Sequence, residues 1–117
     1  MGDDCIFCKI VKGELPSKKI LENEGFIVIM DANPKSKGHC LVVPKVHYET
    51  FLDMPAEKYE SFLRTARMAV VIILKEVRGE GFNFLLNNYG AAGQDVPHVH
   101  MHIIPRKRSD KVKLWDF

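Results

Sequence analysis

The segment spanning residues 98–104 constrains the fold of this chain more than any other stretch. It reads His-Val-His-Met-His-Ile-Ile, so histidine and apolar residues alternate. Because neighbouring side chains of a β-strand point to opposite faces of the sheet, we expect a strand here, ended by Pro105. Its apolar side chains should face the core. Its three histidines should share the other face and line a surface or cleft.

Three histidines in this register cannot all bind one metal ion without strain. Same-face residues lie about 6.6 Å apart along a strand, so the outer pair is separated by roughly 13 Å. Zinc holds neighbouring nitrogen ligands only a little over ~3 Å apart. At least one imidazole is therefore left to act as a nucleophile or acid. The alternative, three solvated histidines on an outward face, explains the perfect alternation less well.

The remainder of the chain predicts an α+β fold with a largely antiparallel sheet. The sequence Asn-Glu-Gly between the first two expected strands is typical of a hairpin. Pro55 suits the first position of a long helix, and Gly79 suits its exit. We expect one domain, residues 1–117. Its elements are helical turns at 5–11, about five strands at 19–22, 26–30, 39–43, 82–86 and 98–104, and the long helix at 55–78.

The long helix is apolar around most of its circumference near its middle. An apolar stripe with the 3.6-residue period is joined by Met68, Val71 and Ile72, which lie off the stripe. Such a helix has two surfaces to bury. One interpretation is a single thick core; the other, which we favour, is a subunit interface. The stripe comprises Tyr59, Phe62, Leu63, Ala66, Ala69, Val70, Ile73, Leu74 and Val77.

Charge and composition narrow the classes of partner. Lys and Arg number 17 against 15 Asp and Glu, a net charge of +2, which gives no reason to expect nucleic acid as a partner. The longest apolar run, residues 68–74, is far shorter than the ~20 residues that span a membrane. Three cysteines are an odd number for a disulfide framework, and the N-terminus lacks a secretory pattern. We therefore expect a reducing compartment, the cytoplasm and also the nucleus.

Cys5 and Cys8 have the spacing of half a tetrahedral metal site. The candidates for the other two ligands are His39, His47 and the spare histidine of the triad. A redox pair is a poorer explanation, because no strand precedes the cysteines as a thioredoxin-like unit requires. Two buried cysteines without metal are a third alternative. Cys40, within an apolar strand, is expected to fill the core.

A loop of small residues, Gly-Ala-Ala-Gly-Gln-Asp at 90–95, precedes the histidine strand. Small residues allow backbone N–H groups to approach an anion closely. Most such loops are only turns, but beside a histidine strand this one is a candidate phosphate cradle.

Together these segments resemble the histidine triad (HIT) family, and within it the zinc-containing subgroup of the Hint-type branch. The resemblance runs through nearly the whole chain, and the combined pattern is highly specific. It consists of Cys-Ile-Phe-Cys-Lys-Ile at 5–10, Asp31, Lys37-Gly38-His39, Pro44-Lys45-x-His47, Asn87, Gly93-Gln94-x-Val96 and the histidine strand.

The resemblance implies a sheet that continues across a two-fold homodimer, with the long helix at the interface. It also implies binding of AMP or a related purine nucleotide. The implied reaction is hydrolysis of nucleoside phosphoramidates (AMP-amine or AMP-lysine) at the α-phosphate through a nucleotidyl-histidine. Alternatives are a dinucleoside polyphosphate hydrolase and a nucleotide-responsive adaptor with incidental hydrolysis. A zinc module without any ligand is more remote.

The same resemblance implies roles for individual residues. His100 is the nucleophile, and we expect its second ring nitrogen to donate to a backbone carbonyl, which fixes the reactive tautomer. His102 contacts phosphate near the leaving group. Structural zinc would be held by Cys5, Cys8, His47 and His98. Besides the two catalytic histidines, the expected nucleotide contacts are Ile6, Phe7 and Leu15 around the base, Asp31 at the ribose, Ala32 and His39, and Asn87, Gly93, Gln94, Asp95 and Val96 near the phosphate.

Two features depart from the family pattern. Asp95 stands where many members have Ser or Thr, and a carboxylate beside a bound phosphate is repulsive unless it is protonated or turned away. It could serve as a general acid for an amine, but we expect it to face out. The chain also ends at Phe117, where longer relatives continue, so any selectivity supplied there is expected to be absent or different.

Overall fold

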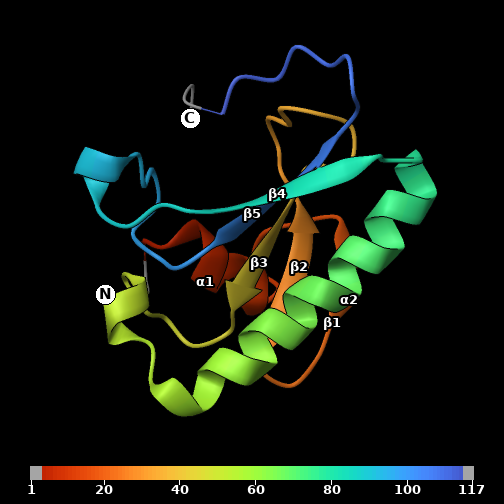
Figure 1. The fold of residues 1–117 in the computed structure, drawn as a ribbon. Helices are drawn as coiled ribbons and strands as arrows, with labels where there is room; N and C mark the ends of the chain where they lie inside the picture. Colours follow the sequence, from red (N-terminus) through yellow and green to blue (C-terminus); the bar gives the residue numbers. More distant parts are fainter. Residues whose placement is uncertain (1–3, 115–117) are drawn as a thin grey trace.

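The computed structural model describes residues 4–114, which form a five-stranded antiparallel sheet with a helix on each face (Figure 1). The strand order is β1-β2-β3-β5-β4, so β1 and β4 are the edges. This confirms the predicted α+β class. No helix within the described range is long and apolar enough to cross a bilayer. The elements are α1 Ile6–Val11, β1 Lys19–Glu22, β2 Phe26–Met30, β3 Cys40–Pro44, α2 Tyr59–Val77, β4 Gly81–Leu86 and β5 Met101–Arg106.

The central strands are buried on both faces, which explains why they read as continuous apolar runs. Val28 and Val42 belong to the core beneath the long helix α2. Ile27 and Leu41 belong to a second core that includes Phe7 of the short helix α1. The second core holds α1, and with it the N-terminal cysteines, against the sheet.

The histidine strand begins later than predicted. Strand β5 starts at Met101, because the preceding residues bond outside the ladder. The N–H of His98 donates to the Val96 carbonyl, and the N–H of Val99 donates to the Tyr48 carbonyl. The first two triad histidines therefore lie on an irregular segment that leads into the strand.

Pro105, which was expected to end its strand, lies within β5, and Pro44 is the last residue of β3. Pro105 pairs only with Phe82 of β4, because the pairing of β5 with β3 has ended at Ile103. Pro44 likewise pairs only with Phe26 of β2. A proline is tolerated at such a local edge, since no neighbour needs its missing N–H.

Helix α2 is shorter than predicted. The α-helix follows a 3-10 turn at Ala56–Lys58 and ends at Val77. The left-handed exit residue is Arg78, with φ 58°, and not the expected Gly79. Gly79 leaves room for a neighbouring side chain: a Cβ there would lie 2.5 Å from Leu74 Cδ2, which would have to shift.

One side of α2 stays exposed. Met68, Val71 and Ile72 are 44%, 58% and 41% exposed, so within one chain the single thick core is wrong. An apolar surface of this kind is typical of an interface. Tyr59 and Leu63 of α2 are also exposed, although the predicted stripe had placed them inward. On the edge strand β4, Phe82 and Phe84 are exposed as well.

Candidate functional site

The three triad histidines lie on the α1 side of the sheet, opposite the apolar residues with which they alternate. This confirms the predicted division of faces. The histidines do not line an open surface, however, because His98, His100 and His102 are 0%, 3% and 4% exposed. Phe7 covers two of them, with its ring centroid 5.6 Å from that of His98 and 5.0 Å from that of His100.

Cys5, Cys8, His47 and His98 converge on one point next to α1. The Sγ atoms of Cys5 and Cys8 lie 3.2 and 3.6 Å from His98 Nδ1. Cys8 Sγ is 3.2 Å from His47 Nδ1, and the two Nδ1 atoms are 3.1 Å apart. Bonds of about 2.3 Å to sulfur and about 2.0–2.1 Å to nitrogen would place tetrahedral zinc ligands roughly 3.3–3.8 Å apart. The donor set and its spacing therefore fit zinc, and His39 is not part of the group.

The ring of His98 is oriented as a metal ligand should be. Its Nε2 lies 2.9 Å from the Pro44 carbonyl oxygen, which can only accept, so Nε2 carries the hydrogen and Nδ1 presents its lone pair to the cysteines. Burial lowers the pKa of His98 to about 4 and raises the pKa of Cys8 to about 11. The imidazole is thus held neutral, while the thiol needs a nearby cation to ionise.

His100 is held in the tautomer that the expected mechanism requires. Its Nδ1 lies 2.8 Å from the His98 carbonyl oxygen and must donate to it, so Nε2 keeps the lone pair. Asp95 is exposed, as expected, but it also lies beside this ring. Its side chain is 73% exposed, but its Oδ1 lies 3.3 Å from His100 Nε2.

A second histidine fixes the tautomer of His102. The backbone N–H of Lys35 donates to His39 Nδ1 at 2.9 Å, so neutral His39 carries its hydrogen on Nε2. That nitrogen lies 2.9 Å from His102 Nδ1, which must accept, and the hydrogen of His102 is therefore on Nε2. Asp31 Oδ2 completes the group, 3.4 Å from His39 Nε2.

Asp31, His39 and His102 are also close enough to bind a metal ion. Burial lowers the pKa of His39, partly offset by Asp31, and lowers the pKa of His102 to about 4, so both rings are neutral. Because His39 Nδ1 already accepts a hydrogen bond, a metal on Nε2 would have to displace the only ring proton. The group is therefore a hydrogen-bond relay that orients His102.

The residues expected around a nucleoside base differ in accessibility. Ile6 and Leu15 are 45% and 39% exposed, as walls of a binding site require. Phe7 is buried against the histidines, and Ala32 is exposed in the loop that follows β2. The structure thus leaves Ile6 and Leu15 of the three expected base contacts open to a ligand, together with Ala32, which was expected elsewhere in the nucleotide site.

The loop before the triad contains a 3-10 turn and is braced by its own side chains. Gly93 has a φ of 95°, and a Cβ there would lie 3.6 Å from Asn87 Nδ2, so these two predicted residues are neighbours. Gln94 donates to the Glu49 carbonyl and accepts from the Tyr89 N–H, each at 2.6 Å. The Gln94 side chain therefore holds the loop. Tyr89 has a φ of 71°, a strained conformation that no sequence signal indicated.

A cavity of about 740 Å³ adjoins the cysteine-histidine cluster and Asp95. Its lining is acidic and also includes His47 and Val96, which packs on the α1 core. The carboxylates that line it are those of Asp4, Glu49, Asp53 and Asp95.

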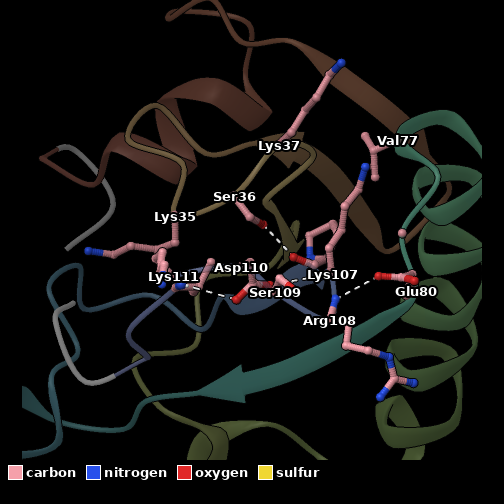
Figure 2. A pocket seen from close by; sticks show the side chains of 13 residues that line it. Lys35, Ser36, Lys37, Val77, Glu80, Lys107, Arg108, Ser109, Asp110 and Lys111 are labelled. Atoms are coloured by element: carbon pink, nitrogen blue, oxygen red, sulfur yellow. Dashed lines mark hydrogen bonds between the residues drawn. The ribbon is translucent and has the colours of Figure 1, made fainter.

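A second cavity, about 850 Å³, lies between residues 35–37, the end of α2 and residues 107–112 (Figure 2). Five of its thirteen lining residues are lysine or arginine, but the labelled Lys35, Lys37 and Arg108 point away from one another. Asp110 accepts from Arg106 at 2.7 Å, so this part of the C-terminal segment is tied to the end of β5. None of the triad histidines lines this groove, and it is not the candidate site.

The sheet, its helices and the buried histidine cluster together define a histidine triad domain. The sequence profile of the HIT domain matches residues 12–109, and the chain belongs to this family.

Several relatives extend over most of the chain. An uncharacterised HIT-like protein of Methanocaldococcus jannaschii is 47% identical over 106 residues, which cover 91% of this chain and 81% of that protein. An adenylylsulfatase of Arabidopsis thaliana is 42% identical over 115 residues, 98% of this chain but 57% of that longer protein. An adenosine 5'-monophosphoramidase of Saccharomyces cerevisiae is 40% identical over 110 residues, 94% of this chain and 66% of that protein.

Solved structures have the same fold. A Streptococcus mutans protein gives a TM-score of 0.91 at 36% identity, covering 96% of this chain and 71% of its own. A Zn-bound histidine triad family protein from Mycobacterium smegmatis gives 0.88 at 35% identity, covering 98% and 84%.

Proposed function

We propose that this chain hydrolyses purine nucleoside phosphoramidates of the AMP-amine or AMP-lysine type, with His100 as the nucleophile. The observation that carries this proposal is the ring of His100. Its Nδ1 hydrogen is bonded to the His98 carbonyl, and its Nε2 lone pair is directed to the side where Asp95 and the glycine loop lie. The names of two relatives, an adenosine 5'-monophosphoramidase and an adenylylsulfatase, support the same class of reaction.

In this reaction His100 Nε2 attacks the α-phosphorus while the bond from phosphorus to the amine breaks. The departing amine takes up a proton from water, and neutral His102, with its hydrogen on Nε2, can donate a hydrogen bond to a phosphate oxygen near the leaving group. Water then cleaves the nucleotidyl-histidine, which releases AMP and restores the imidazole. Backbone N–H groups between Gly93 and Val96 would offset the charge on the phosphate.

The nucleoside would lie between the loop after β2 and helix α1. Asp31 would accept hydrogen bonds from the ribose hydroxyls, and its Oδ1 is already oriented by the N–H of Asn33 at 2.8 Å. Ile6 and Leu15 would contact the base. His39 would position His102, because its Nε2 donates to His102 Nδ1 at 2.9 Å.

We also propose that zinc is bound by Cys5, Cys8, His47 and His98. Four protein ligands leave no open position, so the ion would be structural and would join α1 to the triad. The Zn-bound relative from Mycobacterium smegmatis supports this choice of metal. Cys5, Cys8 and Cys40 form no disulfide, which supports the further proposal of a cytoplasmic location.

The third proposal is a homodimer through α2, with the sheet continued across the edge strand β4. The exposed Val71 and Ile72 on α2 and the exposed Phe82 on β4 support it. A surface of this composition is unfavourable in contact with water and typical of subunit contacts.

The test of the enzymatic proposal is His100→Asn. The variant should lose turnover of an adenosine phosphoramidate yet keep AMP affinity within about tenfold, because attack is removed and little binding is lost. Mass spectrometry of quenched wild-type enzyme should find a nucleotidyl adduct on His100. Unchanged turnover in the variant would refute the role. Faster turnover of a dinucleoside polyphosphate would favour that alternative, and binding without turnover of either substrate would favour an adaptor.

A further inference from the structure

The carboxylate of Asp95 lies at the nitrogen that the proposed reaction uses. Its Oδ1 is 3.3 Å from His100 Nε2, and the Asp95 side chain is 73% exposed, so a substrate can reach it from solvent. The other ring nitrogen of His100 is bonded to the His98 carbonyl. A phosphorus atom must therefore approach Nε2, and the approach passes Asp95.

The surroundings of Asp95 add to the negative charge. Asp4, Glu49 and Asp53 line the same cavity as Asp95. Like charges a few ångströms apart in a partly solvated site repel strongly enough to change binding by roughly tenfold or more. A substrate that brings extra negative charge to the α-phosphorus is disfavoured here, whereas an amine adds none and is attracted once it is protonated.

We propose that Asp95 is a specificity-determining residue that selects substrates whose α-phosphate carries an amine over those in which it carries sulfate or another phosphate. The inference rests on the proposed function, because it concerns the same α-phosphate. It predicts that this chain prefers the first of two reactions for which relatives are named, adenosine monophosphoramidase and adenylylsulfatase.

The test compares kcat/KM for an adenosine 5'-phosphoramidate and for adenylyl sulfate, using the whole chain with its metal. Asp95→Asn removes the charge and keeps the size, and the ratio of the first value to the second should fall about tenfold. The change should appear mainly as a lower KM for adenylyl sulfate. Asp95→Ser should shift the ratio in the same direction, so the result does not depend on one variant.

The matched control is Glu49→Gln. It removes a charge from the lining of the same cavity and leaves the contact between Asp95 and His100 in place. It should change the ratio by less than about threefold, because repulsion weakens with distance and solvent screening. An unchanged ratio in both Asp95 variants, or an equal change in Glu49→Gln, would overturn the inference. Absence of any His100 adduct from wild-type enzyme with either substrate would instead remove the proposed function.

Discussion

Removal of the metal from the cluster of Cys5, Cys8, His47 and His98 should lower the melting temperature by roughly 12–25 °C. The cluster joins segments far apart in the sequence: Cys8 is 39 residues from His47 and 90 from His98. A link that closes a loop of about 90 residues removes unfolded-chain entropy worth about 4–5 kcal/mol. For a domain of this size, each kcal/mol shifts the melting temperature by about 3–5 °C.

Differential scanning calorimetry of metal-loaded and chelator-dialysed protein measures this shift, with metal content determined by mass spectrometry. Cys8→Ser should melt at the lower temperature with or without chelator. Cys40→Ala is the matched control, because Cys40 is a buried thiol in the α2-side core, outside the cluster. It should keep the full response to chelator. A sample with one zinc per chain whose melting temperature does not move on chelation would show that the ion does not stabilise the fold.

Two further predictions concern stability and assembly. In the metal-free protein, the free energy of unfolding should fall as pH decreases from about 6.5 toward 4. Above about pH 6.5 the buried histidines should no longer make it depend on pH. The unfolded histidines have a pKa near 6.5, whereas burial lowers that of His98 and His102 to about 4, so the unfolded chain binds more protons in this window. His39, whose pKa burial also lowers, adds to the same slope. His98 and His102 should each contribute about 1.4 kcal/mol per pH unit, measured by urea titration, and His102→Asn should lower the slope by about that amount; an equal slope in that variant would contradict the assignment. In a separate test, Val71→Glu should convert a dimer to a monomer in light scattering, because it places a charge in the exposed apolar face of α2, while Glu76→Ala on the same helix should leave the dimer intact. A dimer that survives Val71→Glu would exclude that face.

The alternation at residues 98–104 correctly predicted which side chains share a face, because a period of two is a local property of extended chain. It could not predict where the ladder begins. Val99 bonds to the Tyr48 carbonyl outside the sheet, and the ladder starts only at Met101. Pro105 was misjudged for a similar reason, since its tolerance depends on which neighbouring strand is still paired beside it.

The candidate site was predictable in its residue types but not in its connections. Spacing alone left both His39 and His47 as partners of the cysteines, and the fold separates them because His39 contacts His102. The backbone N–H of Lys35 orients His39, and no sequence pattern identifies such a donor. The contact of Asp95 with His100 could not be predicted either, because the sequence does not show which way a loop side chain points.

By itself the sequence determined the α+β class, the bounds of β1 and β2, and a strand whose histidines lie on one face. These follow from periodicity and turn chemistry, which act over a few residues. Only the tertiary structure decided which histidines join Cys5 and Cys8, and which proton each ring carries. The cysteine-histidine cluster depends on contacts between residues 39 to 93 positions apart, and the tautomer of His102 depends on His39, 63 positions away. Such contacts exist only after the sheet and α1 have packed together.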